Sequence, residues 1–102
     1  MDRIAQLRSF IAASPDEAFP RYALALELKG TGDHAQAAVE LAELLRRKPD
    51  YLAGYLQQGM LLQTLGRNEE AKDFYRRGQE LARRTGDGKT LSELTQALEL
   101  LA

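Results

Sequence analysis

Residues 15–48 read PDEAFPRYALALELKGTGDHAQAAVELAELLRRK, and residues 49–82 read PDYLAGYLQQGMLLQTLGRNEEAKDFYRRGQELA. The two stretches align without a gap at a period of 34 residues. Their identical pairs are Pro15 and Pro49, Asp16 and Asp50, Leu28 and Leu62, Gly32 and Gly66, and Ala37 and Ala71. A fixed period of about 20–50 residues marks supersecondary units that stack on one another, and such units build surfaces for holding partners. The repeat therefore favours recognition over catalysis.

The composition is that of an ordinary globular domain with no strong charge. The chain has 102 residues, of which 44% are apolar and 28% are charged, and its net charge is −1. This length suits one domain. A net charge so close to zero gives no field that would collect nucleic acid or anionic lipid, so neither partner is expected. The absence of cysteine and the presence of a single histidine, His34, exclude thiolate chemistry and a histidine metal cluster. We expect no cofactor and no metal.

The hydropathy pattern gives no sign of a membrane segment. No apolar run approaches the length that spans a bilayer. Residues 1–4 do not open a secretion signal, because Gln6, Arg8 and Ser9 interrupt the apolar residues that follow. A cytoplasmic protein is the expectation.

Glycine and proline divide a chain of good helix formers into six segments. The predicted helices cover about residues 2–13, 18–30, 34–47, 52–65, 68–84 and 90–101, with ends good to about three residues. Because the connections are short, neighbouring helices should be antiparallel. The predicted fold class is all-α.

The first helix of each repeat has two apolar faces. At about 100° per residue, Tyr22, Leu26 and Lys29 share one face, and Leu24 and Leu28 lie nearly opposite. The second repeat shows the same division, with Leu56 and Met60 on one face and Tyr55, Leu62 and Leu65 on the other. A helix of this kind either is sandwiched or packs on its own domain with one face and presents the other to a partner.

A helix–turn–helix unit of 34 residues, with a small residue in each helix, a turn glycine and a closing proline, resembles the tetratricopeptide repeat. The first unit, residues 18–51, shows the pattern at Leu24, Ala25, Leu28, Gly32, Ala37, Leu41, Leu44 and Pro49. The second, residues 52–85, shows it at Tyr55, Gly59, Leu62, Gly66, Ala71, Tyr75 and Gly78. The sequence departs from the pattern at Arg21, where the family often has tryptophan, at Gln58, where leucine is expected, and at Arg83, where proline is usual.

The resemblance implies a single domain, residues 1–102, with the form of an α–α superhelix of about six antiparallel helices. Residues 1–15 resemble the second helix of a preceding half-repeat, and residues 86–102 resemble a terminal cap. Ala25, Gly59 and the other pattern residues would pack the paired helices, which approach closely where side chains are small. Thr90 and Glu93 fit a capping box at the start of the cap helix.

In the family, the first helices line a concave groove in which partners lie. By position, the lining residues here would be Phe19, Tyr22, Leu26, Lys29, Leu56, Gln57, Met60 and Gln63. Some members hold terminal carboxylates of a peptide with Lys, Asn and Arg in this groove, whereas the corresponding places here carry Tyr22, Leu26, Gln57 and Met60. The groove should therefore prefer an apolar or amphipathic helix, or an extended apolar peptide, to an acidic tail. The same face could instead be covered by the terminal helices or by a second copy of the chain.

Two motifs offer a weaker, chemical interpretation. Gly88, Lys89 and Thr90 open a helix as a phosphate-binding loop does, but position 83 is arginine where that loop needs glycine, and a helix precedes it instead of a strand. His34 opens a helix, where we expect it to be exposed, with no neighbouring nucleophile to activate. Paired acids and paired arginines fall mostly where the helix macrodipole favours them.

The sequence thus predicts a non-enzymatic adaptor that binds a protein or peptide of unknown identity. One alternative is a homo-oligomer, such as a homodimer, that uses the same groove. The alternative of another class is a nucleotide-binding protein or enzyme that uses Lys89 and Thr90 with His34.

Overall fold

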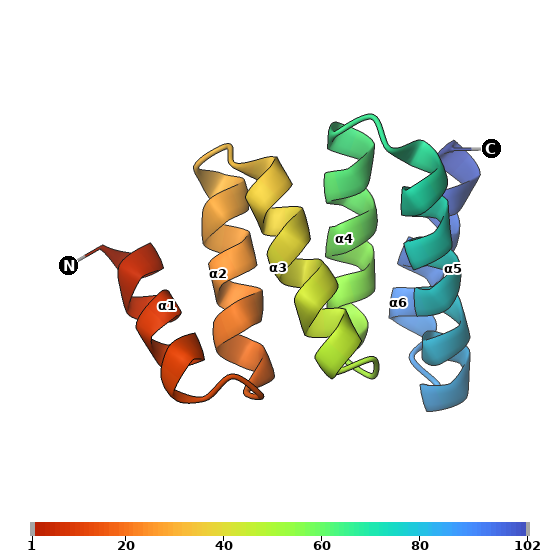
Figure 1. Cartoon of the computed structure of the whole chain (residues 1–102). Helices are drawn as coiled ribbons and strands as arrows, with labels where there is room; N and C mark the ends of the chain where they lie inside the picture. Colours follow the sequence, from red (N-terminus) through yellow and green to blue (C-terminus); the bar gives the residue numbers. More distant parts are fainter. Residues whose placement is uncertain (1, 102) are drawn as a thin grey trace. The chain divides into compact units, whose positions relative to one another are not determined.

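The computed structural model describes residues 2–101, and these residues form six α-helices and no strand (Figure 1). The helices are α1 (Arg3–Ala13), α2 (Ala18–Gly30), α3 (His34–Arg47), α4 (Leu52–Thr64), α5 (Asn68–Thr85) and α6 (Gly88–Leu100). The predicted all-α fold class is therefore confirmed. Among the described residues, no helix has the length and apolar character needed to cross a membrane.

The chain divides into two compact units, one ending at Tyr51 and the other beginning at Leu52. This boundary falls between the two sequence repeats. The first unit contains α1, α2 and α3, and the second contains α4, α5 and α6. Each unit thus holds one complete helical hairpin and one additional helix. The prediction of a single domain stays a prediction.

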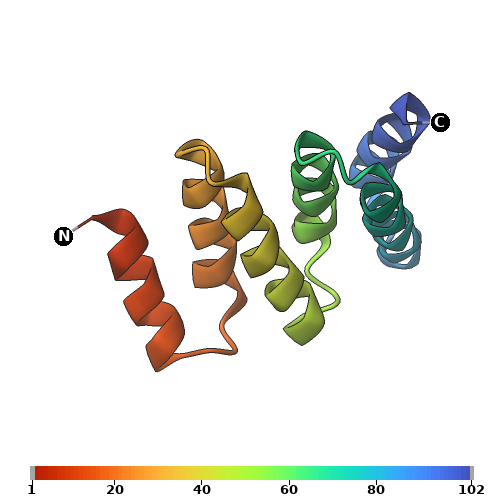
Figure 2. The ribbon, with the colours of Figure 1, turned by 45° about the horizontal axis from the view of Figure 1, so that its top comes forward.

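In the first unit, α2 and α3 form an antiparallel hairpin, and α1 packs beside α2 (Figures 1 and 2). Ala25 of α2 and Ala37 of α3 are fully buried, as is Leu41. Small side chains let the two helices approach closely, so that the larger leucines around them close the core. The chain reverses at Gly32, whose φ of 88° suits a residue without a Cβ atom.

The second unit contains the hairpin of α4 and α5, with α6 packed against α5. Gly59 lets the ring of Tyr75 lie directly on the α4 backbone, since a Cβ atom at position 59 would be 2.1 Å from Tyr75 Cε1. Gly78 of α5 allows a close approach on two sides, because a Cβ atom there would be 2.8 Å from Tyr55 Cβ on α4 and 3.0 Å from Cδ1 of the fully buried Leu94 on α6. Gly66, with φ of 76°, makes the turn.

Most residues of the repeat pattern lie in these two cores. Twelve of the fifteen are buried, namely Leu24, Ala25, Leu28, Ala37, Leu41, Leu44, Tyr55, Gly59, Leu62, Ala71, Tyr75 and Gly78. Of the other three, Gly32 and Gly66 form the hairpin turns, and Pro49 is exposed.

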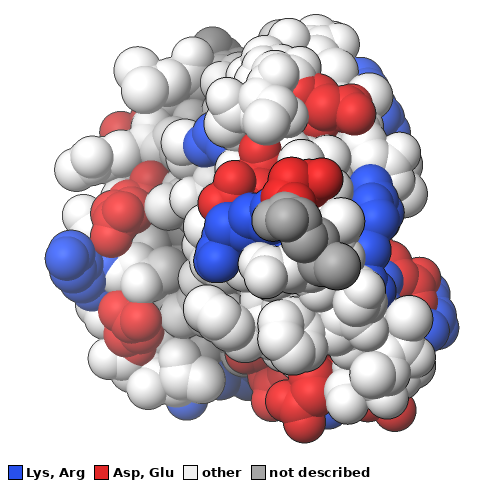
Figure 3. All heavy atoms as spheres, turned by 90° about the vertical axis from the view of Figure 1, so that its left-hand side faces the viewer, with Lys and Arg blue, Asp and Glu red and all other residues white. Residues whose placement is uncertain are grey.

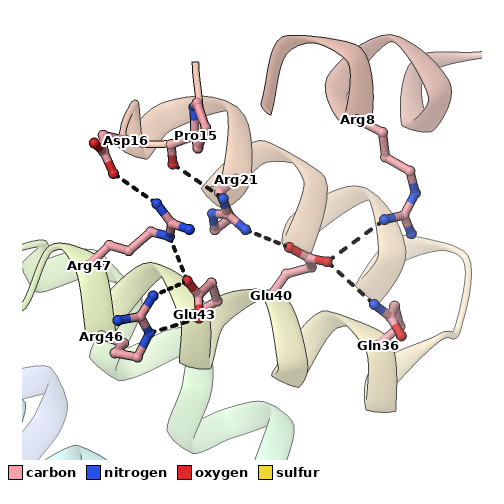
Figure 4. Close-up of polar contacts among 9 residues, drawn as sticks. All are labelled: Arg8, Pro15, Asp16, Arg21, Gln36, Glu40, Glu43, Arg46 and Arg47. Atoms are coloured by element: carbon pink, nitrogen blue, oxygen red, sulfur yellow. Dashed lines mark hydrogen bonds and ion pairs between the residues drawn. The ribbon is translucent and has the colours of Figure 1, made fainter. Parts of the chain in front are cut away.

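One pair of equivalent positions is filled differently in the two units. In the first, Arg21 Nη1 donates to Glu40 Oε1 at 3.3 Å, and the two side chains are only 10% and 12% exposed (Figure 4). Thirty-four residues further on, the same positions are Tyr55 and Phe74, whose ring centroids lie 6.4 Å apart. An ion pair therefore joins the hairpin in one unit where an aromatic contact joins it in the other.

The carboxylates of α3 are held by a wider set of arginines (Figure 4). Arg46 and Arg47 both donate hydrogen bonds to Glu43, and these bonds lower the pKa of that carboxyl from 4.5 to about 2. Because the folded-state pKa is the lower one, this contribution to stability is present above pH 4.5 and is lost as the pH falls towards 2.

A titration of the Glu43 side-chain carboxyl carbon by NMR tests this arrangement. We expect a midpoint near the pKa of about 2 in the native chain. In the Arg46→Gln, Arg47→Gln variant the midpoint should return towards 4.5, the ordinary value, because the neutral amides no longer favour the ionised form. An unchanged midpoint in the variant would show that the arginines are not its cause.

The cap helix begins within three residues of the predicted position, but a different residue caps it. It starts at Gly88, and its N-cap is Asp87, whose carboxylate accepts the Thr90 N–H at 3.0 Å and the Thr90 hydroxyl at 2.9 Å. The predicted capping box of Thr90 and Glu93 is therefore wrong. Aspartate caps a helix as well as threonine does, and here it lies three residues nearer the preceding turn.

Candidate binding surface

The first set of predicted lining residues lies on one side of α2. Phe19, Tyr22, Leu26 and Lys29 fall within a narrow arc of the helix at about 100° per residue. Phe19 is 65% exposed and Leu26 is 37% exposed, whereas Tyr22 and Lys29 are half-buried. The ring of Tyr22 rests 5.2 Å from that of Tyr51, centroid to centroid. The most accessible apolar surface of this set is therefore at Phe19 and Leu26.

The second set lies on α4, in the other unit. Met60 is 39% exposed, and Leu56, Gln57 and Gln63 are half-buried. The side-chain oxygen of Gln63 accepts the hydroxyl of Tyr75, so this glutamine is fixed by its own hairpin. The helix reads LAGYLQQGMLLQT and carries no charged residue. The four predicted lining residues of α4 therefore carry amide, thioether and hydrocarbon groups only.

Sequence reasoning missed the two aromatic partners of these sets. Tyr51 follows α3 and Tyr75 belongs to α5, so neither shares a helix face with the residue that it contacts. No local pattern could have indicated them. The structure places four of the eight predicted residues in each unit, and their combination into one groove stays a prediction.

The surrounding charges do not form a single large field. On the face viewed in Figure 3, acidic and basic residues are interspersed with uncharged side chains. Elsewhere in the chain, charges are also paired locally, such as Arg67 with Glu70 at 2.6 Å. Attraction to a highly charged partner is therefore weak at long range.

The residues proposed for nucleotide binding are engaged in other ways. The Thr90 N–H and hydroxyl, which a phosphate would need, already bond to Asp87, and the bonds from Thr90 lower the pKa of Asp87. A carboxylate at the start of α6 would repel an anion. Lys89 is exposed, and it belongs to a different unit from His34.

His34 differs from its predicted exposure. The side chain is half-buried, and its Nδ1 atom is buried without a hydrogen-bond partner. It follows the N-cap Asp33, whose carboxylate accepts the Gln36 N–H at 3.2 Å. Within residues 2–101, no group of three or more His, Cys, Asp or Glu side chains is arranged to hold a metal ion.

Comparison with known proteins gives the class of this fold. The hairpins are those of helical repeat proteins, and the family model described as "Tetratricopeptide repeat" matches residues 1–81. The chain therefore belongs to the tetratricopeptide repeat family. No curated protein matches the sequence.

Solved structures agree with this assignment. A tetratricopeptide repeat domain protein from Salinibacter ruber is 38% identical, with a TM-score of 0.79, over 83% of this chain and 94% of that one. The TPR2B domain of yeast Sti1, in a complex with pHsp70, has a TM-score of 0.88 at 12% identity, over 96% and 78% of the two chains. The type III secretion translocator chaperone SycD of Yersinia enterocolitica has a TM-score of 0.86 at 16% identity, over 96% and 75%. The last two likenesses concern the fold alone.

Proposed function

We propose that this protein is a non-catalytic adaptor that binds an apolar or amphipathic peptide or helix through the leading helices of its repeats. The observation that carries the proposal is the exposure of Phe19, Leu26 and Met60 on α2 and α4. Their helices already bury their opposite faces, Leu24 and Leu28 in one and Leu62 in the other. Apolar side chains that remain outside a completed core are available to a partner.

The chemistry of α4 supports a partner of low charge. Because α4 has no charged residue, an acidic peptide tail would find no cation there. Glutamine amides can satisfy the backbone of a bound segment, and a methionine side chain adapts to varied apolar surfaces. The TPR2B domain of Sti1, which has the same fold, forms a complex with pHsp70. This complex is consistent with the binding of a protein or peptide by the chain described here. A cytoplasmic location is part of the proposal and can be checked by fractionating host cells.

Aspartate at two of these positions tests the adaptor function. The Leu26→Asp, Met60→Asp variant should reduce the affinity for a purified partner by at least about tenfold, because burying a carboxylate in an apolar contact is costly. Partners captured from the native host are identified by mass spectrometry, and their affinity is then measured by calorimetry. Circular dichroism verifies that the variant remains helical.

Val39→Asp is the matched control. Val39 is 58% exposed on α3, a trailing helix, so one of the two added negative charges is placed outside the proposed surface. The control should bind as the native chain does. If the double variant also binds normally, the leading helices are not the binding surface and the proposal is wrong.

A second copy of the chain is the alternative occupant of the same residues. Exposed apolar side chains on both leading helices would favour self-association as well as partner binding. Light scattering at increasing concentration distinguishes the two, because a protein that stays monomeric excludes the homo-oligomer. Heat released on titration with a nucleotide would instead favour the nucleotide-binding alternative.

A further inference from the structure

The first helix is joined to its unit by a narrow apolar contact and by two ion pairs. Leu7 is the one buried residue among those of α1, and Ile4, Ala5 and Ile11 are half-buried. Arg3 Nε lies 2.8 Å from Glu27 Oε1 on α2. Arg8 Nη1 lies 3.8 Å from Glu40 Oε2 on α3, and the Glu40 side chain is 12% exposed (Figure 4). The side chains of Arg3 and Arg8 are 57% and 48% exposed. Ion pairs of this kind are weak and are screened by salt.

The segment after α1 is fixed to the rest of the unit. Arg21 Nη2 donates to the Pro15 carbonyl at 3.2 Å, and Arg47 Nη1 pairs with Asp16 Oδ1 at 2.8 Å (Figure 4). These contacts come from α2 and α3, not from α1. Any movement of α1 must therefore pivot on the N-terminal side of Pro15, at Ser14.

The residues of α2 and α3 that contact α1 also make contacts with each other that do not involve α1. Glu40 keeps its ion pair with Arg21 and accepts a hydrogen bond from Gln36 Nε2 at 3.4 Å, both of which are independent of α1. The core residues Ala25 and Leu41 join α2 to α3 directly. Removing α1 would expose the position of Leu7 but would leave the hairpin formed.

We propose that α1 is a hinged arm, which opens about Ser14 while the α2–α3 hairpin stays folded, and whose closure depends on ionic strength. The helix at the other end provides a contrast within the same chain. Leu94 of α6 is fully buried against Gly78, and Gln79 Nε2 donates to the Thr95 hydroxyl oxygen at 3.0 Å. These contacts are apolar or neutral, so salt should not loosen α6. The inference does not depend on the proposed adaptor function.

Amide hydrogen exchange on the unaltered chain tests the arm. Between about 0.02 M and about 1 M salt the screening length falls from tens of ångströms to a few. We expect the hydrogen-bonded amides of α1 to exchange about five times faster at the higher salt, while those of α3 and α6 keep their rates. Equal acceleration in α1 and α3 would mean that the hairpin opens with the arm, which would overturn the proposal.

A pair of matched variants separates charge from general destabilisation. Arg3→Gln, Arg8→Gln removes both links, so α1 should exchange fast at low salt and lose its salt dependence. Arg46→Gln, Arg67→Gln removes the same charge from exposed pairs with Glu43 and Glu70, which do not involve α1. Exchange in α1 should be unchanged in this control. If both variants, or neither, accelerate exchange in α1, the ion pairs of Arg3 and Arg8 do not hold α1 closed, and the proposal is wrong.

Discussion

Gly59→Ala should destabilise the protein by about 1–3 kcal/mol, although alanine is the better helix former by about 1 kcal/mol. The new methyl carbon would be placed 2.1 Å from Tyr75 Cε1, far inside van der Waals contact. The ring cannot move easily, because it is fully buried and its hydroxyl bonds to Gln63. The helices α4 and α5 must separate, or the ring must leave its place in the core. Urea denaturation followed by circular dichroism measures the change.

Gly30→Ala is the control for this substitution. Gly30 also lies in a helix, but a Cβ atom there would meet nothing within 4 Å. Alanine at this position should leave stability unchanged or raise it by up to about 1 kcal/mol. If alanine stabilises the chain at both positions, α4 and α5 do not approach each other closely at Gly59.

Arg21→Tyr alone should lower the free energy of unfolding by about 2–4 kcal/mol, because it leaves Glu40 largely buried without its main partner. Adding Glu40→Phe should recover most of this loss. The double variant places in the first unit the two aromatic residues that the second unit has at the equivalent positions, Tyr55 and Phe74. In the second unit Arg77 also lies over both rings, whereas the equivalent position of the first unit is Glu43. Replacing a buried ion pair by packed apolar groups is often neutral or stabilising.

Denaturation of the native chain, both single variants and the double variant provides a double-mutant cycle. A coupling energy above about 1 kcal/mol is expected for residues in direct contact. Glu40→Phe alone should also be destabilising, since it leaves Arg21 with only the Pro15 carbonyl among the partners described above. If the losses of the two single variants simply add, the two positions do not form a unit.

Much of this fold could be predicted because its signals are local. Glycine and proline end each helix near the residue where they occur, and the turn glycines Gly32 and Gly66 have the positive φ that such turns require. The N-cap of α6 was assigned to the wrong residue because two possible capping residues, Asp87 and Thr90, lie three positions apart, and only the geometry distinguishes them. Local rules cannot resolve that choice.

Contacts between helices were beyond the reach of the same rules. Arg21 was recognised as a departure from the family pattern, but nothing near it indicated Glu40 as its partner. The available signal was the repeat itself, since both residues are replaced by aromatic ones 34 positions later. The lining residues could be placed on their helix faces in the same way, whereas Tyr51 and Tyr75 come from other segments and could not be predicted as neighbours.

The exchange of an ion pair for an aromatic pair also bears on how duplicated repeats diverge. A single substitution at either position leaves a charge or a ring facing an unsuitable neighbour, so we expect the intermediate to be less stable than either end state. The two sites should consequently change together, as opposite charges or as two rings. In a designed array, the two positions should therefore be chosen as a pair in every hairpin.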